Sequence, residues 1–334
     1  MHNQSGGAQP WMAPLTGKTY AQGSHSSTRV GLSEVFTGEQ GRDLGFIREA
    51  VPFLEELGFD TLWLPEHVVW FETYESSYPY GQVGEAEILS ERAEEGNIGV
   101  RGLYDSLVFH AAAAMLTKRM RLGTYVLIAT LRNPVVLARQ ITTLDHLSNS
   151  RLDLGIGIGW AREEYRACQV DFARRGPRLD DYLRAMQSLW AQEVSDHQGE
   201  WVNFTDVLAY PKPIQYPNPP IYIGGQSRRS IRRAAELGDG LMVYDLAVEH
   251  VEQTLDTLQM ECNQLGRPAK EVKMIIGRRN EGRDADAYES DAKYIGACAA
   301  LGAHEVVCSP RFPLNSWFED MGRYATAIGV SAGT

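Results

Sequence analysis

The sequence is poor in cysteine, carries no excess of basic residues and contains no long apolar run. Its four cysteines are far apart and form no CxxC pair, so neither a disulfide framework nor a metal site is expected. Lys and Arg total 32 against 43 Asp and Glu, and this net charge of −11 disfavours nucleic acid and anionic membranes as partners. No apolar run reaches the ~18 residues that a bilayer-spanning helix needs. Together these features predict a cytoplasmic protein.

The first 28 residues lack the apolar core of a secretory signal. They are rich in Gly, Ser and Gln, and we interpret them as a tail or a peripheral wrap. We expect the rest of the chain, residues 29–334, to form a single domain.

Short apolar segments alternate with longer helical patterns through residues 29–334. Eight such segments lie at 29–36, 61–65, 121–128, 151–158, 220–223, 240–244, 272–276 and 304–308. They are too short and too apolar to be half exposed, which indicates a parallel sheet buried on both faces. A doubly wound sheet is the competing architecture, but eight strand–helix units in this length favour an α/β fold of the closed (β/α)8 TIM-barrel type.

Two insertions interrupt the alternation. Residues 193–219, before the fifth strand, are expected to form a hairpin and an extended connection. Residues 70–103, after the second strand, are expected to form a lid or a substrate-binding loop, because the loops after the strands build the active-site face of such a barrel. The aromatic residues of this loop are Trp70, Phe71, Tyr74, Tyr78 and Tyr80, and they favour an apolar or planar substrate.

Glycines occur at the ends of two predicted strands. The spacing in 155–159 is GxGxG rather than GxGxxG, which argues against a Rossmann dinucleotide site. Gly224 and Gly225 precede Gln226 and Ser227 at the start of a helix. There the backbone can approach a ligand closely and free N–H groups favour a phosphate, although a plain turn with Ser227 as N-cap is the alternative.

Several other strand ends carry residues with reactive or ligand-binding side chains. Glu66 and His67 follow the second strand, where a histidine can perform acid–base chemistry or serve a structural role. Gly159 and Trp160 close the fourth strand and are suited either to a wall for a planar ligand or to ordinary packing. Candidates for contact with a substrate or cofactor at other strand ends are Trp70, Tyr244, Arg278 and Arg311.

A set of motifs in family-like order resembles the bacterial luciferase-like flavin and deazaflavin oxidoreductases. The set comprises LGFDTLWLPEH (57–67), RLGT (121–124), LRNP (131–134), QITTLDHLS (140–148), RLDLGIGIGW (151–160), EEY (163–165), RLD (178–180), PKP (211–213), PIYIGG (220–225) and GDG (238–240). The resemblance extends over about residues 29–280. The Pro-Glu-His-Val stretch is similar to that of the subgroup described as dependent on coenzyme F420.

This resemblance implies a TIM barrel that binds a flavin or deazaflavin at the carboxyl ends of its strands. It implies a cis peptide between Tyr125 and Val126 that backs the ring, with Gly224 to Ser227 holding the cofactor phosphate. His67 would donate or accept a proton near the ring or stabilise the charge of the reduced cofactor. Glu66 is a second catalytic candidate, and Gly159, Trp160 and Tyr244 complete the cofactor site.

Three functions follow as hypotheses. The first is hydride transfer between F420 and a small organic substrate. The second is an FMNH2-dependent monooxygenase that uses oxygen and a partner reductase, and the third is a flavin-binding barrel without catalysis. A homodimer is expected by analogy with the family.

Overall fold

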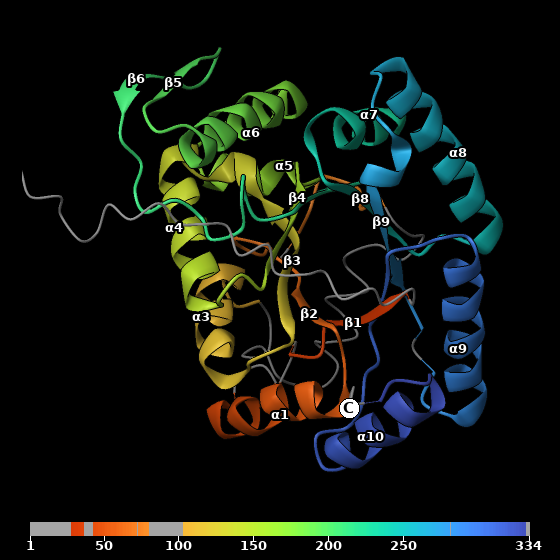
Figure 1. Ribbon diagram of the computed structural model, residues 1–334. Helices are drawn as coiled ribbons and strands as arrows, with labels where there is room; N and C mark the ends of the chain where they lie inside the picture. The colour runs from red at the N-terminus through yellow and green to blue at the C-terminus, as the bar shows by residue number, and fades with distance from the viewer. Residues whose placement is uncertain (1–27, 37–42, 72, 80–102, 281, 332–334) are drawn as a thin grey trace, which may run out of the picture.

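Eight parallel strands close into a barrel in the computed structural model, which describes residues 28–36, 43–71, 73–79, 103–280 and 282–331. Around the barrel the strand order is β1-β10-β9-β8-β7-β4-β3-β2, so the predicted (β/α)8 fold is confirmed (Figure 1). The barrel strands are β1 (Arg29–Ser33), β2 (Thr61–Leu64), β3 (Arg121–Ile128), β4 (Leu152–Gly157), β7 (Ile221–Gly224), β8 (Gly240–Tyr244), β9 (Lys273–Arg278) and β10 (Glu305–Cys308).

Helices surround the barrel and cover the outer face of its strands (Figure 1). They are α1 (Leu44–Leu57), α3 (Ser106–Leu116), α4 (Pro134–Leu147), α6 (Arg175–Ala191), α7 (Arg228–Leu237), α8 (Val248–Gln264), α9 (Ala285–Ala300) and α10 (Trp317–Ala327). Side chains of Asp43, Asp105 and Asn133 accept hydrogen bonds from the first turns of α1, α3 and α4, which fixes where these helices begin. In the described parts of the chain, no helix has both the length and the apolar character needed to cross a bilayer.

The insertion before the fifth barrel strand contains the predicted hairpin. Strands β5 (Ser195–Gln198) and β6 (Asn203–Val207) pair antiparallel beside α6 (Figure 1). The insertion after β2 is described only over residues 70, 71, 73–79 and 103. Its remaining part, which includes Tyr80, lies outside the described residues, as do residues 1–27 of the expected tail.

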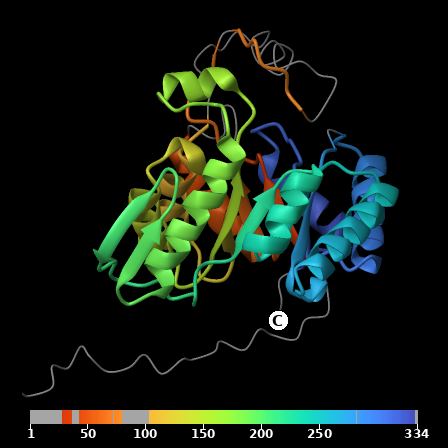
Figure 2. The same cartoon turned by 90° about the horizontal axis from the view of Figure 1, so that it is seen from above.

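Two features differ in detail from the sequence-based boundaries. The first strand ends at Ser33 instead of residue 36, because Glu34 turns the chain with a positive φ of 61°. The fourth strand is followed by a short additional helix, α5 (Arg162–Ala167), before α6 begins. In Figure 2, α5 and the orange segment that follows β2 lie on the same side of the barrel.

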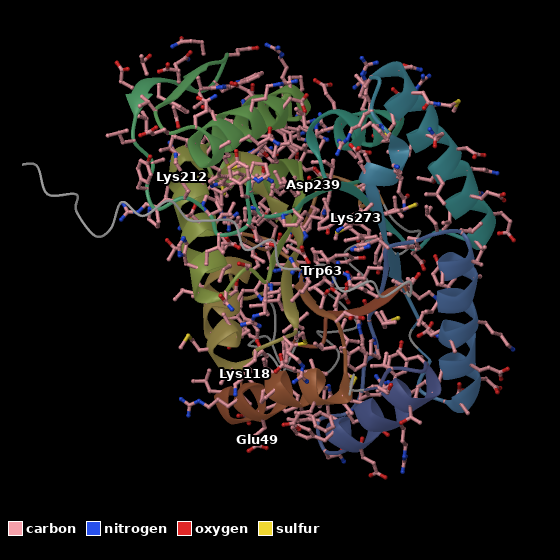
Figure 3. All side chains as sticks on the ribbon, in the orientation of Figure 1. Glu49, Trp63, Lys118, Lys212, Asp239 and Lys273 are labelled. Carbon is pink, nitrogen blue, oxygen red and sulfur yellow. The ribbon has the colours of Figure 1, made fainter. Side chains whose placement is uncertain are left out.

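Side chains fill the interior of the barrel at the amino ends of its strands. Trp63 lies at the centre of the barrel, whereas Glu49 and Lys118 lie at the periphery (Figure 3). The Trp63 indole N–H donates to Glu305 at 2.6 Å, and the Glu305 carboxylate also lies 2.6 Å from the Arg29 guanidinium. Trp63 and Glu305 are buried, and their contacts with each other and with Arg29 close the amino end, so the carboxyl end is the side at which a ligand can enter.

Candidate functional site

The third strand carries a bulge that places Val126 against two glycines. The register between β3 and β4 shifts at this point, and the Tyr125–Val126 peptide bond is cis, as the resemblance implied. A Cβ atom on Gly157 would lie 2.6 Å from Cγ2 of Val126, and one on Gly224 would lie 2.9 Å from its Cγ1. Only glycine leaves room for the valine at these two strand ends. Val126 and the two glycines thus form a cradle at the carboxyl ends of β3, β4 and β7.

Tyr125 fills the barrel below this cradle. Its ring lies 6.1 Å from that of Trp63 and 6.4 Å from that of Tyr244, and its hydroxyl reaches the space where a Cβ of Gly277 would stand. Burial raises the pKa of Tyr125 and of Tyr244 above the usual value for tyrosine, so both phenols remain protonated at neutral pH. Among the described residues the buried Tyr125 hydroxyl has no hydrogen-bond partner.

The chain that follows β7 turns through Gly225 into the start of α7. Gly225 has a positive φ of 128°, and its N–H donates to the carbonyl of Met242 at 3.0 Å. Gln226 donates from its side chain to the carbonyl of Tyr244, which anchors this turn to β8. Ser227 is the N-cap of α7, and its Oγ accepts from the N–H of Ser230 at 3.2 Å. The other N–H groups of the first turn have no intrahelical acceptor and can bind an anion.

His67 is held by a carboxylate from the segment after β4. Its Nδ1 atom lies 3.2 Å from Oε2 of Glu164, which is buried, and Oε1 of Glu164 accepts from the N–H of Val68 at 2.5 Å. The His67 ring centre lies 4.7 Å from that of Trp70 and 5.9 Å from that of Trp160. The structure therefore brings together three residues that the sequence predicted separately, from the ends of β2 and β4.

Glu66 is engaged in a different set of contacts from its neighbour. Its buried carboxylate pairs with the guanidinium of Arg132 and accepts from Oγ of Ser106 at 2.9 Å. Arg132 in turn lies 3.0 Å from the carboxylate of Asp105, the N-cap of α3. Burial raises the pKa of Glu66, while Arg132 and Ser106 act in the opposite direction. These contacts tie the end of β2 to the start of α3.

Aromatic rings form one wall of the site around Trp160. The rings of Tyr74 and Tyr78 lie 5.3 Å and 5.6 Å from that of Trp160, and they come from the loop after β2. Gly159 has a positive φ of 62°, and its carbonyl accepts from the Arg175 side chain at 3.3 Å. In the part of the chain that the structure describes, the buried indole nitrogens of Trp70 and Trp160 have no acceptor. The wall thus consists of apolar ring faces and contains two buried indole N–H donors.

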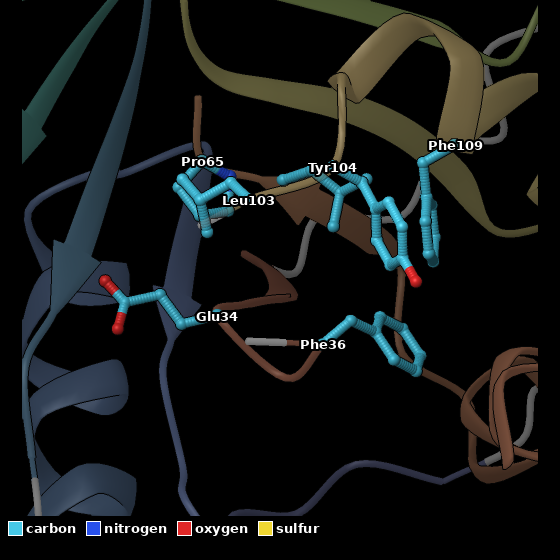
Figure 4. Close-up of a pocket in the computed structure, with 7 residues that line it drawn as sticks. Glu34, Phe36, Pro65, Leu103, Tyr104 and Phe109 are labelled. Atoms are coloured by element: carbon cyan, nitrogen blue, oxygen red, sulfur yellow. The ribbon is translucent and has the colours of Figure 1, made fainter. Parts of the chain in front are cut away.

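A small pocket lies at the ends of β1 and β2. It is lined by Glu34, Phe36, Leu64, Pro65, Leu103, Tyr104 and Phe109 (Figure 4). The rings of Tyr104 and Phe109 lie 5.8 Å apart, and that of Phe36 lies 5.4 Å from Phe109. Arg311, a predicted substrate residue, lies 2.7 Å from the carboxylate of Glu34 and so neutralises its charge. The pocket is small, and its lining is mostly apolar.

Arg278, the other arginine predicted to contact substrate, binds residues of α9. Its guanidinium lies 3.1 Å from Asp291 and 4.6 Å from the ring centre of Tyr294, both on α9. The structure therefore ties Arg278 to a helix rather than to the residues around His67.

Three residues of the site were given no individual role from the sequence, although two of them, Arg132 and Glu164, lie within the LRNP and EEY motifs. Glu34, Arg132 and Glu164 follow β1, β3 and β4, so their position after a barrel strand was the available signal. Their partners lie between 66 and 277 residues away along the chain, which no local pattern reveals. Among the described residues, no three His, Cys, Asp or Glu side chains come together as a metal site would require.

Comparison with known proteins places these features in a family. The luciferase-like monooxygenase family matches residues 25–281 of this chain. An uncharacterized protein of Mycobacterium tuberculosis (strain H37Rv), Rv0953c, is 35% identical over 211 residues, which are 63% of this chain and 71% of the relative. The oxygenase component of the flavin-dependent trigonelline monooxygenase of Acinetobacter baylyi is 33% identical over 156 residues, 46% of this chain and 43% of the relative.

Solved structures show the same fold. An F420-dependent secondary alcohol dehydrogenase in complex with an F420-acetone adduct superposes with a TM-score of 0.70. The superposition covers 90% of this chain and 99% of that one at 16% sequence identity. At this identity the likeness establishes the architecture alone.

Proposed function

Because the chain belongs to the luciferase-like monooxygenase family, we propose that it is an oxidoreductase that transfers a hydride between coenzyme F420 and an organic substrate. The observation that carries the proposal is the cradle of Val126, Gly157 and Gly224, which continues into the start of α7, where the first N–H groups have no intrahelical acceptor. A ring and a phosphate of one ligand can occupy these neighbouring positions together. The stretch from Pro65 to Val68, which resembles the F420-dependent subgroup, favours the deazaflavin.

The residues around this cradle have distinct tasks in the proposed reaction. The bound cofactor supplies the hydride chemistry, and the protein supplies orientation and exclusion of water. His67, at the rim, donates or accepts the proton that accompanies hydride transfer. Trp70 and Trp160 shield the reacting face.

A second candidate function uses the same site with FMNH2 and oxygen. It is favoured by the 33% identity to the oxygenase component of a flavin-dependent monooxygenase. A protein of this kind receives its reduced flavin from a separate reductase, so a partner reductase is part of this alternative. A homodimer and a cytoplasmic location remain predictions for either function.

A parallel titration with F420 and FMN, each oxidised and reduced, tests the proposal by fluorescence. We expect micromolar or tighter binding of F420 and at least tenfold weaker binding of FMN. Gly224→Val is the matched control, because its side chain enters the space of Val126 and the cradle. Preference for reduced FMN would establish the alternative, and binding of neither cofactor would contradict both.

A further inference from the structure

Two adjacent glutamates begin the short helix α5, and both are buried. Glu163 is 6% exposed and Glu164 is 1% exposed, although glutamate in a first helical turn is ordinarily solvated. Successive residues of a helix point about 100° apart, so the two carboxylates reach different parts of the segment that follows β2. Figure 2 shows that segment beside α5.

Glu164 contacts the first part of this segment. One carboxylate oxygen faces Nδ1 of His67 at 3.2 Å, and the other accepts from the N–H of Val68 at 2.5 Å. A carboxylate accepts hydrogen bonds and does not donate them, so Nδ1 carries the proton of the neutral ring. Nε2 of His67 is then the acceptor nitrogen.

Glu163 contacts the segment seven to eight residues further on. Its Oε1 atom accepts from the N–H groups of Glu75 at 2.6 Å and Ser76 at 3.0 Å. Oγ of Ser76 in turn accepts from the N–H of Arg162 at 3.0 Å, so the loop and the helix bind each other reciprocally. Burial raises the pKa of Glu163, but hydrogen bonds from backbone N–H groups outweigh this effect and lower it. The carboxylate is therefore ionised at neutral pH.

The contacts of Glu163 and Glu164 hold different side chains of the site in place. The residues around Glu75 carry Tyr74 and Tyr78, whose rings lie within 6 Å of Trp160. Those near Val68 carry His67 and Trp70. We propose that Glu164 positions His67 in one tautomer for proton transfer, whereas Glu163 positions the aromatic wall that selects a planar, apolar substrate. The roles in proton transfer and selection rest on the proposed function, but the two anchoring contacts depend on this chain alone.

Amide hydrogen exchange, read by NMR at single residues, tests the anchoring without any cofactor. Glu163→Ala is expected to speed exchange at Glu75 and Ser76 at least tenfold and to leave Val68 within twofold. Glu164→Ala is expected to speed exchange at Val68 at least tenfold and to leave Glu75 and Ser76 within twofold. Glu163→Gln keeps the acceptor oxygen and should restore slow exchange at Glu75 and Ser76. Unchanged exchange in both alanine variants overturns the proposal.

Glu164→Gln separates positioning of the histidine from anchoring of the loop. Its amide oxygen still accepts from Val68, but its NH2 group now donates to Nδ1 of His67 and so favours the other tautomer. In 15N spectra of the imidazoles, the His67 signals, assigned by their loss in His67→Gln, are expected to change from the Nδ1–H to the Nε2–H pattern. Retention of the wild-type pattern overturns the role of Glu164.

Kinetics complete the test once a substrate is identified. Glu164→Gln is expected to lower kcat at least tenfold with KM within twofold, and Glu163→Ala to raise KM at least tenfold with kcat within threefold. Glu249→Ala, which removes an exposed glutamate from the first turn of α8, is the control for loss of a first-turn charge. If the variants change amide exchange and the His67 tautomer as expected, but the protein shows no turnover with F420 or FMN, the anchoring contacts are supported and the proposed function is contradicted.

Discussion

The side chain of Val126 occupies the space that a side chain on Gly224 would need. The distance from Cγ1 of Val126 to the position of such a Cβ atom is 2.9 Å. Val126 belongs to β3 and Gly224 ends β7, so this packing joins two strands that are separated by β4 in the barrel. Since Gly225 continues directly into the turn before α7, the same pair links the proposed ring position to the proposed phosphate position.

Gly224→Ala is therefore expected to weaken cofactor binding. The added methyl group displaces Val126 toward the ring, and we expect at least a tenfold loss of affinity in the fluorescence titration. Val126→Ala alone should change affinity by less than threefold. The double variant Val126→Ala/Gly224→Ala should recover most of the loss, because it removes the steric conflict; a tenfold coupling corresponds to about 1.4 kcal/mol. A double variant no better than Gly224→Ala would show that the two side chains do not share this space.

Ser227→Asp is expected to separate phosphate binding from helix capping. Aspartate caps a helix as well as serine, so the free energy of unfolding should remain within about 0.5 kcal/mol of the wild type. Its charge, however, repels a phosphate at the start of α7. We expect FMN to bind at least tenfold more weakly and riboflavin, which has no phosphate, to bind unchanged.

The control for this experiment is Ser227→Ala, which removes the Oγ acceptor for Ser230. It should lower the free energy of unfolding by about 1 kcal/mol. An equal loss of FMN and riboflavin affinity in Ser227→Asp would refute the phosphate assignment.

The fold was predictable because its signals are local. Each barrel strand is a short apolar run, Asp43 and Asn133 cap helices as their positions suggest, and Gly58 ends α1 with a left-handed φ of 102°. The hairpin before β7 was also predicted, from the aromatic residues and prolines of segment 193–219. Because the carboxyl ends of all barrel strands lie on one face, Gly224, His67 and Trp160 could be predicted to lie on the same side of the molecule.

The contacts within the site were less predictable, because they join residues far apart in sequence. His67 and Glu164 are separated by 97 positions, and Glu66 and Arg132 by 66. The direction of a long side chain also depends on its neighbours. Arg278 follows a barrel strand as Arg311 does, yet Asp291 on α9 binds the first and Glu34 the second. No periodicity of the sequence encodes that choice.

Arg132→Met is expected to destabilise the protein because it leaves the buried carboxylate of Glu66 without its cation. Removing one partner of a buried ion pair costs about 3 kcal/mol or more. We expect the free energy of unfolding in urea to fall by about that amount. Glu66→Gln/Arg132→Met should recover part of it, because the neutral amide can still accept from Ser106. If Arg132→Met were as stable as the wild type, the pair would contribute nothing to folding.

Protonation of buried His110 is expected to make stability depend on pH. His110 lies on α3 with its Nε2 atom 2.8 Å from the carbonyl of Gly123, and burial lowers its pKa from 6.5 to about 4. Between these two values the unfolded chain binds a proton that the folded protein does not bind. The free energy of unfolding should therefore fall as the pH is lowered from 6.5 to 4, and His110 should contribute up to about 1.4 kcal/mol per pH unit. His110→Gln keeps a donor toward Gly123 but does not titrate in this range. Urea unfolding of both proteins across the window should show a shallower slope for the variant, and identical slopes would mean that His110 is protonated equally in the folded and unfolded states.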